Sequence, residues 1–124
     1  MARILVAEDD TTVQTFVKRA LTRAGHTVTS VDDGLQALEA LEGPDARGGT
    51  DYDLLITDIS MPGLDGIGLA LKVTRDHPNL RIILMTAYTA EQQRAHNLDE
   101  IVFDVVLKPF TLEQICRQAE AALA

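Results

Sequence analysis

Five short apolar runs are spaced along the chain, and each is followed by turn residues and a stretch with helical periodicity. The runs predicted as strands are Ile4–Ala7, Thr27–Val31, Leu54–Ile56, Arg81–Thr86 and Phe103–Leu107. A short apolar run bounded by turn signals is typical of a strand buried on both faces of a sheet. The second run is half polar, so we expect that strand near an edge of the sheet.

Apolar residues at a spacing of three and four predict a helix after each strand. The apolar positions of the first helix are Val13, Phe16, Val17, Ala20, Leu21 and Ala24, and Gly25 ends this helix. The later helices are marked by Leu35, Leu38 and Leu41; by Ile67, Ala70, Leu71 and Thr74; by Ala90, Ala95 and Leu98; and by Leu112, Ile115, Cys116, Ala119 and Leu123. Asp10 or Thr11 is expected to cap the first helix. Capping boxes are predicted at Thr11 with Gln14, Thr89 with Gln92 and Thr111 with Gln114.

Five strand–helix units in succession predict an α/β fold, doubly wound and flavodoxin-like, with a parallel five-stranded sheet and helices on both faces. Right-handed crossovers favour the strand order 2-1-3-4-5. We expect one domain over residues 1–124, with no output domain after it, and a surface loop over Gly43–Asp51.

Composition and charge narrow the classes of function. The chain of 124 residues has a formal net charge of −8, which argues against a binder of nucleic acid or of an anionic membrane. There is no apolar run near the ~18 residues of a membrane span, and the first strand begins too early for a signal peptide. The one cysteine excludes an internal disulfide. We therefore expect a cytoplasmic protein.

Acidic residues follow the first and third strands directly. Glu8 and Asp9 come after the first, and Asp58 after the third. Because these strands are neighbours in the predicted order, the three carboxylates meet at one edge of the sheet, together with Thr86 and Lys108 at the ends of the last two strands. Clustered carboxylates repel unless a cation intervenes, and oxygen ligands suit Mg²⁺.

A carboxylate beside a cation can act as a nucleophile on phosphorus and form an aspartyl phosphate. Asp58 is the candidate phosphoacceptor. Mg²⁺, the ammonium of Lys108 and the hydroxyl of Thr86 would each neutralise one oxygen of the transferred group.

These features resemble the receiver domain of two-component response regulators, the fold of the chemotaxis regulator. The motifs that carry the resemblance are Ile4–Asp10, Asp58–Gly66, Thr86-Ala87 and Lys108-Pro109-Phe110, in this order and at these separations. The resemblance implies that Asp58 takes phosphate from a histidine kinase or a histidine phosphotransferase. It also implies that a downstream protein binds through the face formed by the fourth helix, the fifth strand and the fifth helix.

The same resemblance implies the details of the site. Asp9 and Asp58 would be direct Mg²⁺ ligands, Glu8 would act through water, and the backbone carbonyl of Ser60 would be a further ligand. Thr86 would be the switch hydroxyl, and the Lys108-Pro109 peptide bond would be cis. Ser60 and Tyr88 flank the phosphorylation site by family position, where they either tune the phosphate lifetime or only line the crevice.

The sequence departs from the family pattern at two positions. Val105 stands where an aromatic ring usually swings inward with the threonine, and Tyr88 or Phe103 is a possible substitute for that ring. Ile101 stands where the family often has glycine. The usual coupling between the threonine and the ring is therefore in doubt.

Within the family, Gln92–Asp99 and Asp104–Phe110 resemble the CpdR-like single-domain regulators of alphaproteobacteria. That resemblance implies a cell-cycle regulator that adapts substrates to the ClpXP protease through a ClpX-type unfoldase and is inactivated by phosphorylation. Two alternatives stay open: a degenerate receiver that serves as a scaffold without phosphate, and a phosphohydrolase with an aspartyl intermediate. The phosphohydrolases usually need a second acid two residues after the nucleophile, where this chain has Ser60. We therefore expect no enzyme activity beyond self-phosphorylation and dephosphorylation.

Overall fold

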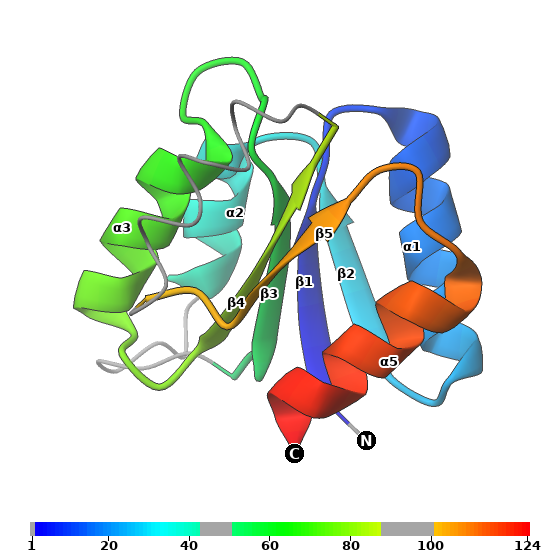
Figure 1. Ribbon diagram of the computed structural model, residues 1–124. Coiled ribbons are helices and arrows are strands. Elements are labelled where there is room, and N and C mark those ends of the chain that lie inside the picture. The colour runs from blue at the N-terminus through cyan, green and yellow to red at the C-terminus, as the bar shows by residue number, and fades with distance from the viewer. Residues whose placement is uncertain (1, 43–50, 88–100) are drawn as a thin grey trace.

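A parallel sheet lies between two helical layers in a computed structural model, which describes residues 2–42, 51–87 and 101–124 (Figure 1). The strands are β1 Arg3–Ala7, β2 Thr27–Val31, β3 Leu54–Asp58, β4 Arg81–Thr86 and β5 Asp104–Leu107; the helices are α1 Thr11–Arg23, α2 Gly34–Leu41, α3 Gly66–Asp76 and α5 Leu112–Leu123. The strand order is β2-β1-β3-β4-β5, and every pairing is parallel, which confirms the predicted fold. None of the helices in these ranges is long and apolar enough to cross a membrane.

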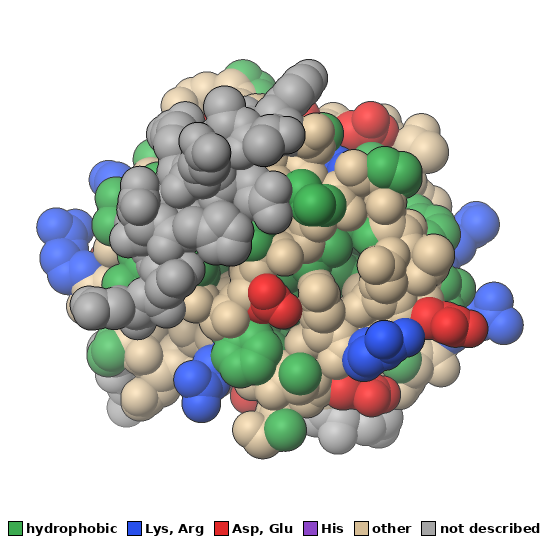
Figure 2. Space-filling model, in the orientation of Figure 1, with side chains coloured by type: hydrophobic (Ala, Val, Ile, Leu, Met, Phe, Trp, Pro, Cys, Tyr) green, Lys and Arg blue, Asp and Glu red, His purple; other side chains and the backbone are tan. Residues whose placement is uncertain are grey.

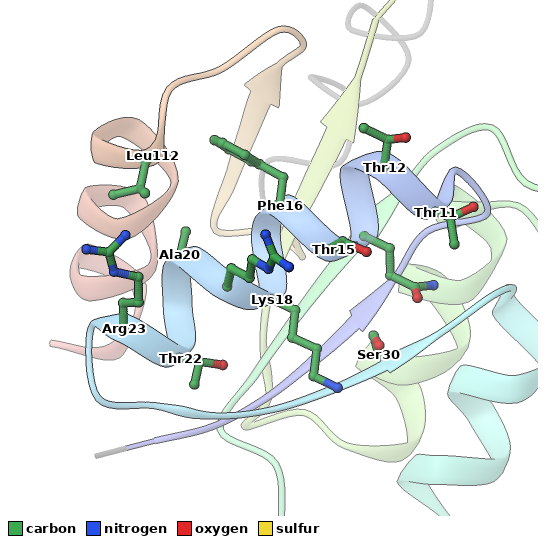
Figure 3. A pocket seen from close by; sticks show the side chains of 12 residues that line it. Thr11, Thr12, Thr15, Phe16, Lys18, Ala20, Thr22, Arg23, Ser30 and Leu112 are labelled. Atoms are coloured by element: carbon green, nitrogen blue, oxygen red, sulfur yellow. The ribbon is translucent and has the colours of Figure 1, made fainter.

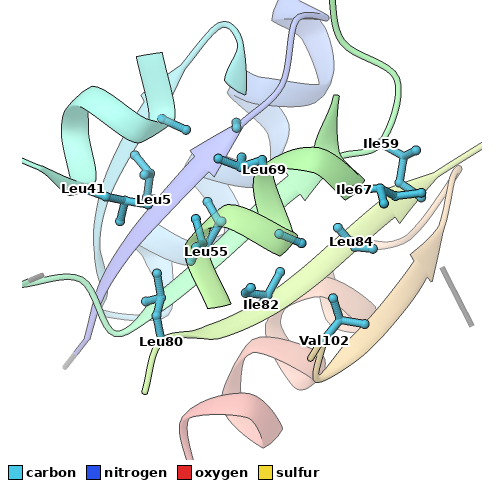
Figure 4. Close-up of a cluster of buried hydrophobic side chains, with 14 of the residues drawn as sticks. Leu5, Leu41, Leu55, Ile59, Ile67, Leu69, Leu80, Ile82, Leu84 and Val102 are labelled. Atoms are coloured by element: carbon cyan, nitrogen blue, oxygen red, sulfur yellow. The ribbon is translucent and has the colours of Figure 1, made fainter. Parts of the chain in front are cut away.

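The central strands are buried on both faces, so they send alternate side chains into two separate cores. Leu5, Leu55 and Ile82 pack under α2 and α3 (Figure 4). Ile4 and Ile56 pack under α1 and α5 on the other face. Burying one such side chain contributes about 1.5–3 kcal/mol. These two cores fix the strands rigidly, and the functional residues follow at the strand ends.

Four large apolar side chains that the helical pattern placed toward the core are instead exposed. The exposed fractions are Phe16 39%, Leu35 57%, Leu71 52% and Leu112 40%. Leu35 lies outside the stripe of α2 formed by Gly34, Ala37 and Leu41, and Leu112 is the first residue of α5. Leu71 lies outside the stripe of α3 formed by Leu69, Ala70 and Val73, and Phe16 meets the ring of Phe110 at 6.1 Å between centroids.

Several helix ends are capped by a side chain or followed by a glycine. The cap of α1 is Asp10, whose carboxylate accepts hydrogen bonds from the amides of Thr12 and Val13, so the predicted Thr11–Gln14 capping box is wrong. Gly25 follows α1 with a φ of 101°, as a helix stop requires. The Thr111–Gln114 box is present in full. The Thr89–Gln92 box and the helix predicted up to Leu98 lie outside the described residues.

Candidate functional site

Three carboxylates meet at the carboxyl ends of β1 and β3. These strands pair directly, with Ala7 opposite Thr57, so Glu8 and Asp9 come out beside Asp58. One carboxylate oxygen from each of the three residues lies within 4.8 Å of the other two. Glu8 is fully buried and Asp58 is 5% exposed, whereas Asp9 is open to solvent. The expected convergence at one edge of the sheet is therefore present.

Lys108 reaches this cluster from the end of β5. Its Nζ lies 2.8 Å from Oε2 of Glu8 and 3.3 Å from Oδ1 of Asp58. The amide of Lys108 donates to the carbonyl of Thr86 at 2.8 Å, which holds the end of β5 against the end of β4. The Lys108-Pro109 bond is cis, as the resemblance implied. One ammonium thus serves two nearly buried carboxylates.

Burial dominates the electrostatics of the cluster. It raises the pKa of Glu8 to about 7 although the hydrogen bond from Lys108 opposes the shift, and it raises the pKa of Asp58 for the same reason. Burial alone would lower the pKa of Lys108, but the hydrogen bond to Glu8 and the charges of Asp58 and Glu8 outweigh it and raise that pKa. Burial therefore makes the ionised forms of these carboxyls costly, and an added cation that compensates their charge would be stabilised there.

A hollow of about 480 Å³ opens beside these groups. It is lined by Glu8, Asp9, Asp10, Thr11, Asp58, Ser60, Ala87 and Lys108. Five of the six predicted site residues thus line one hollow. The sixth, Thr86, is fully buried at the end of β4, and its neighbour Ala87 forms the wall there.

A larger hollow of about 1030 Å³ runs along α1 (Figure 3). Phe16 and Leu112 supply exposed apolar surface to it, and Lys18 and Arg19 supply positive charge. Among the described residues, no carboxylate lines this hollow, and Thr11 belongs to both hollows. The surface along α1 is thus continuous with the acidic site but opposite to it in charge.

The turn after β3 is held by close backbone packing. The amide of Gly66 donates to the carbonyl of Ile59 at 2.9 Å, and a Cβ at Gly66 would overlap the carbonyl oxygen of Asp58. Asp65 caps α3 by accepting from the amide of Gly68. The start of α3 therefore packs directly against the backbone of Asp58.

The environment of Gln14 does not follow from the sequence pattern. Its Nε2 donates to the carbonyls of Glu8 and Val31 and to Oδ1 of Asp32, at 2.8, 3.0 and 3.0 Å. The spacing from Thr11 to Gln14 suggested a capping box, and no local pattern distinguishes that use from a contact to β2, whose end is 17 positions away.

The positions that depart from the family pattern lie close to β5. Val105 and Ile101 are partly buried against the core under α2 and α3. Phe103 is 43% exposed, and its amide donates to the carbonyl of Ile82. The strand β5 begins at Asp104, one residue later than predicted. Tyr88, the other candidate substitute ring, lies outside the described residues.

The donor set fits the cation that the sequence predicted. All three potential ligands are carboxylates, and Ser60 lies on the same hollow. Hard oxygen donors in a partly open hollow suit Mg²⁺, which keeps several waters. Two nearly buried carboxyls and one exposed one, set against a single lysine, point the same way.

Comparisons with known proteins agree with the fold and with the receiver-domain resemblance. The chain is 37% identical over 123 residues to the response regulator receiver protein CpdR of Brucella abortus. This match covers 99% of the chain and 98% of CpdR. It is 34% identical over 119 residues to the transcriptional regulatory protein TcrA of Mycobacterium tuberculosis and 32% identical over 121 residues to the regulator NtrC of Escherichia coli. These matches cover 96% and 98% of the chain but only 45% and 24% of the two longer regulators.

Solved structures give the same answer. The response regulator TrrA of Thermotoga maritima, in complex with Mg²⁺ and BeF, matches with a TM-score of 0.84 and 28% identity over 99% of this chain and all of TrrA. The family model of the response regulator receiver domain matches residues 4–120. The chain therefore belongs to the response regulator receiver domain family.

Proposed function

We propose that Asp58 accepts a phosphoryl group from the phosphohistidine of a histidine kinase or a histidine phosphotransferase. The observation that carries this proposal is the placement of the Lys108 ammonium between Glu8 and Asp58, beside a hollow that these carboxylates share with Asp9. A carboxylate oxygen of Asp58 forms the new P–O bond while the P–N bond of phosphohistidine breaks. The bonding electrons stay on the imidazole nitrogen, which then takes up a proton.

The charges around Asp58 match this transfer. Mg²⁺, held by Asp9, Asp58 and the carbonyl of Ser60 with Glu8 acting through water, would neutralise negative charge on the transferred group. The ammonium of Lys108, which now contacts Asp58, is placed to pair instead with another oxygen of the transferred group. Thr86 remains the predicted third contact, from its buried position at the end of β4.

The test is intact-mass spectrometry after incubation with acetyl phosphate and Mg²⁺. Wild-type protein should gain one phosphate, and Asp58→Asn should gain none. Asp76→Asn is the matched control, because Asp76 is an exposed acid whose ion pair with Arg75 lies at the surface. Wild-type protein that takes no phosphate would favour the scaffold, and steady release of phosphate from small phosphomonoesters would favour the phosphohydrolase.

We further propose that the phosphorylation state controls binding of a downstream protein at the edge formed by β5 and the start of α5. Phe103, Leu107 and Leu112 are 43%, 47% and 40% exposed there. In the orientation of Figure 1, hydrophobic side chains reach this surface among scattered charged ones (Figure 2). The predicted fourth helix, which would complete this face, lies outside the described residues.

The similarity to CpdR over nearly its whole length supports a role as a cell-cycle adaptor for proteolysis. The proposed partner is a ClpX-type unfoldase, and the unphosphorylated form is the proposed binding form. In a pull-down with purified unfoldase, Asp58→Ala protein should bind, and wild-type protein loaded with beryllofluoride and Mg²⁺ should bind at least fivefold less. Equal capture of both forms would contradict control by phosphate, and capture of neither would contradict this partner.

A further inference from the structure

Gln14 joins the two loops that flank the acidic end of β1. Its side-chain amide extends from the first turn of α1 to the carbonyl of Glu8, the carbonyl of Val31 and the carboxylate of Asp32. All three partners are acceptors, so the NH₂ group must face them, and its two hydrogens serve three oxygens. The network continues through the amide of Asp32, which donates to Oε1 of Gln36 at 2.9 Å.

The carbonyl of Glu8 is the link to the site, because it shares a peptide plane with the amide of Asp9. Fixing that oxygen therefore fixes the direction in which Asp9 leaves the strand. The neighbouring contacts act on the same short turn: the amide of Glu8 donates to the carbonyl of Val31, and the amide of Asp10 donates to Oε1 of Glu8 at 3.0 Å. Without Gln14, the carbonyl of Glu8 would lose the side-chain donor that joins it to β2.

We propose that Gln14 is a positioning residue that holds the Glu8–Asp9 turn in the orientation needed for cation binding. This inference rests on the cation site proposed above. Groups that orient metal ligands from behind typically affect affinity by 10–100-fold. Gln14 acts on the backbone between two of the proposed ligand residues and contacts no ligand oxygen in its side-chain hydrogen bonds, so we expect the lower end of that range.

The experiment compares Mg²⁺ dissociation constants by isothermal titration calorimetry. Gln14→Met keeps the length of the side chain and removes its donors, and Mg²⁺ should bind about tenfold more weakly. Gln14→Glu adds a negative charge near the site, which by charge alone would tighten Mg²⁺ binding. If Gln14 acts by positioning, this variant also weakens binding, because a carboxylate cannot donate to the two carbonyls.

Gln114→Met is the matched control. Gln114 also lies in the first turn of a helix and forms a side-chain bond to backbone, accepting from the amide of Thr111 at 2.8 Å. Its loss should leave Mg²⁺ affinity within twofold of wild type. Gln14 variants that bind Mg²⁺ like wild type would overturn the inference and leave the cation site intact, whereas a wild-type protein that binds no Mg²⁺ would overturn the cation site itself.

Hydrogen exchange of the metal-free protein gives a second readout, independent of the cation. The amides of Glu8 and Asp10 should exchange at least fivefold faster in Gln14→Met than in wild type or Gln114→Met. Unchanged exchange at both amides would mean that Gln14 does not hold the turn, and would overturn the inference whatever the calorimetry shows.

Discussion

Lys108 is shared between two carboxylates that would otherwise be buried without a counterion. Its ammonium lies 2.8 Å from Glu8 and 3.3 Å from Asp58, and its side chain is 18% exposed. Removing one partner from a desolvated ion pair leaves the other charge uncompensated. In the metal-free protein the lysine therefore occupies part of the role that a cation would fill, and it competes with that cation.

Lys108→Met tests this competition. The variant keeps an apolar stem of similar length, so we expect the fold to persist, and Mg²⁺ should bind on the order of tenfold more tightly because the competing positive charge is gone. Phosphorylation by acetyl phosphate should nevertheless slow by about 100-fold, because the charge that stabilises the transferred group is lost. Calorimetry gives the affinity and intact-mass kinetics the rate. Affinity and rate that fell together would contradict this separation.

At the scale of elements, the start of α3 packs against the end of the strand that carries Asp58, the proposed phosphoacceptor. Gly66 has no room for a side chain because the carbonyl oxygen of Asp58 occupies that space. Its amide donates to the carbonyl of Ile59, so the helix and the strand end are connected through backbone alone.

Gly66→Ala should therefore lower the free energy of unfolding by about 2–4 kcal/mol and weaken Mg²⁺ binding, since the strand end must shift to admit a methyl group. Gly68→Ala is the control in the same turn, because its Cβ would meet mainly the flexible side chain of Leu64, at 2.9 Å. Urea unfolding measures the free energy of unfolding of both variants. Equal losses in the two variants would mean that contact with the Asp58 backbone has no special cost.

The helix α1 presents a different surface to a partner. Its sequence contains Lys18, Arg19 and Arg23 and no acidic residue, in a chain whose net charge is −8. Its hollow shares Thr11 with the hollow of the proposed phosphorylation site. A protein that delivers phosphate to Asp58 is therefore expected to dock along α1.

The double substitution Phe16→Ala with Lys18→Glu should slow phosphate transfer from the cognate phosphohistidine protein by at least tenfold. Transfer from acetyl phosphate should stay within twofold, because a small donor needs no docking surface. Both rates can be followed by the appearance of phosphorylated protein. A loss with both donors would place the effect in the chemistry rather than in docking, and no loss with either would exclude α1 as the docking surface.

The elements show where prediction from sequence works in this chain. The apolar runs of β1, β3 and β4 are buried on both faces, and such runs depend little on their surroundings, so they were predicted well. Leu35 and Leu112 were expected in the core and are exposed, because periodicity alone does not fix which side chains of a helix face the sheet. Gln14 could not be predicted, because its partners come from a neighbouring loop rather than from its own turn.

At the scale of the whole molecule, the buried cluster makes stability depend on pH. The pKa of Glu8 is about 7 in the folded protein against an ordinary value of 4.5, and burial is the cause. The folded form therefore binds a proton more tightly than the unfolded chain. This contribution to stability is fully present below about pH 4.5 and is lost as the pH rises through about 7. The raised pKa of Asp58 acts in the same direction.

Metal-free protein should therefore be more stable at pH 5.5 than at pH 7.5, by about 1–2 kcal/mol in urea unfolding. Glu8→Gln carries no titrating carboxyl at this position and should lose most of that difference, which separates the effect from the three histidines. Added Mg²⁺ should stabilise the wild type more at pH 7.5 than at pH 5.5, because protons compete for the same oxygens. Stabilisation by Mg²⁺ that was larger at pH 5.5 than at pH 7.5 would contradict this assignment.

The contact between Lys108 and Glu8 spans one hundred positions of the chain. A chain emerging from the ribosome presents its acidic residues early, but their lysine arrives only when the last strand has been made and has docked beside β4. Fragments that end before that strand would hold two uncompensated carboxylates and should neither fold stably nor accept phosphate. Competence to receive phosphate should thereby depend on β5 and the lysine at its end, and fragments without them are expected to draw no phosphate from the donor.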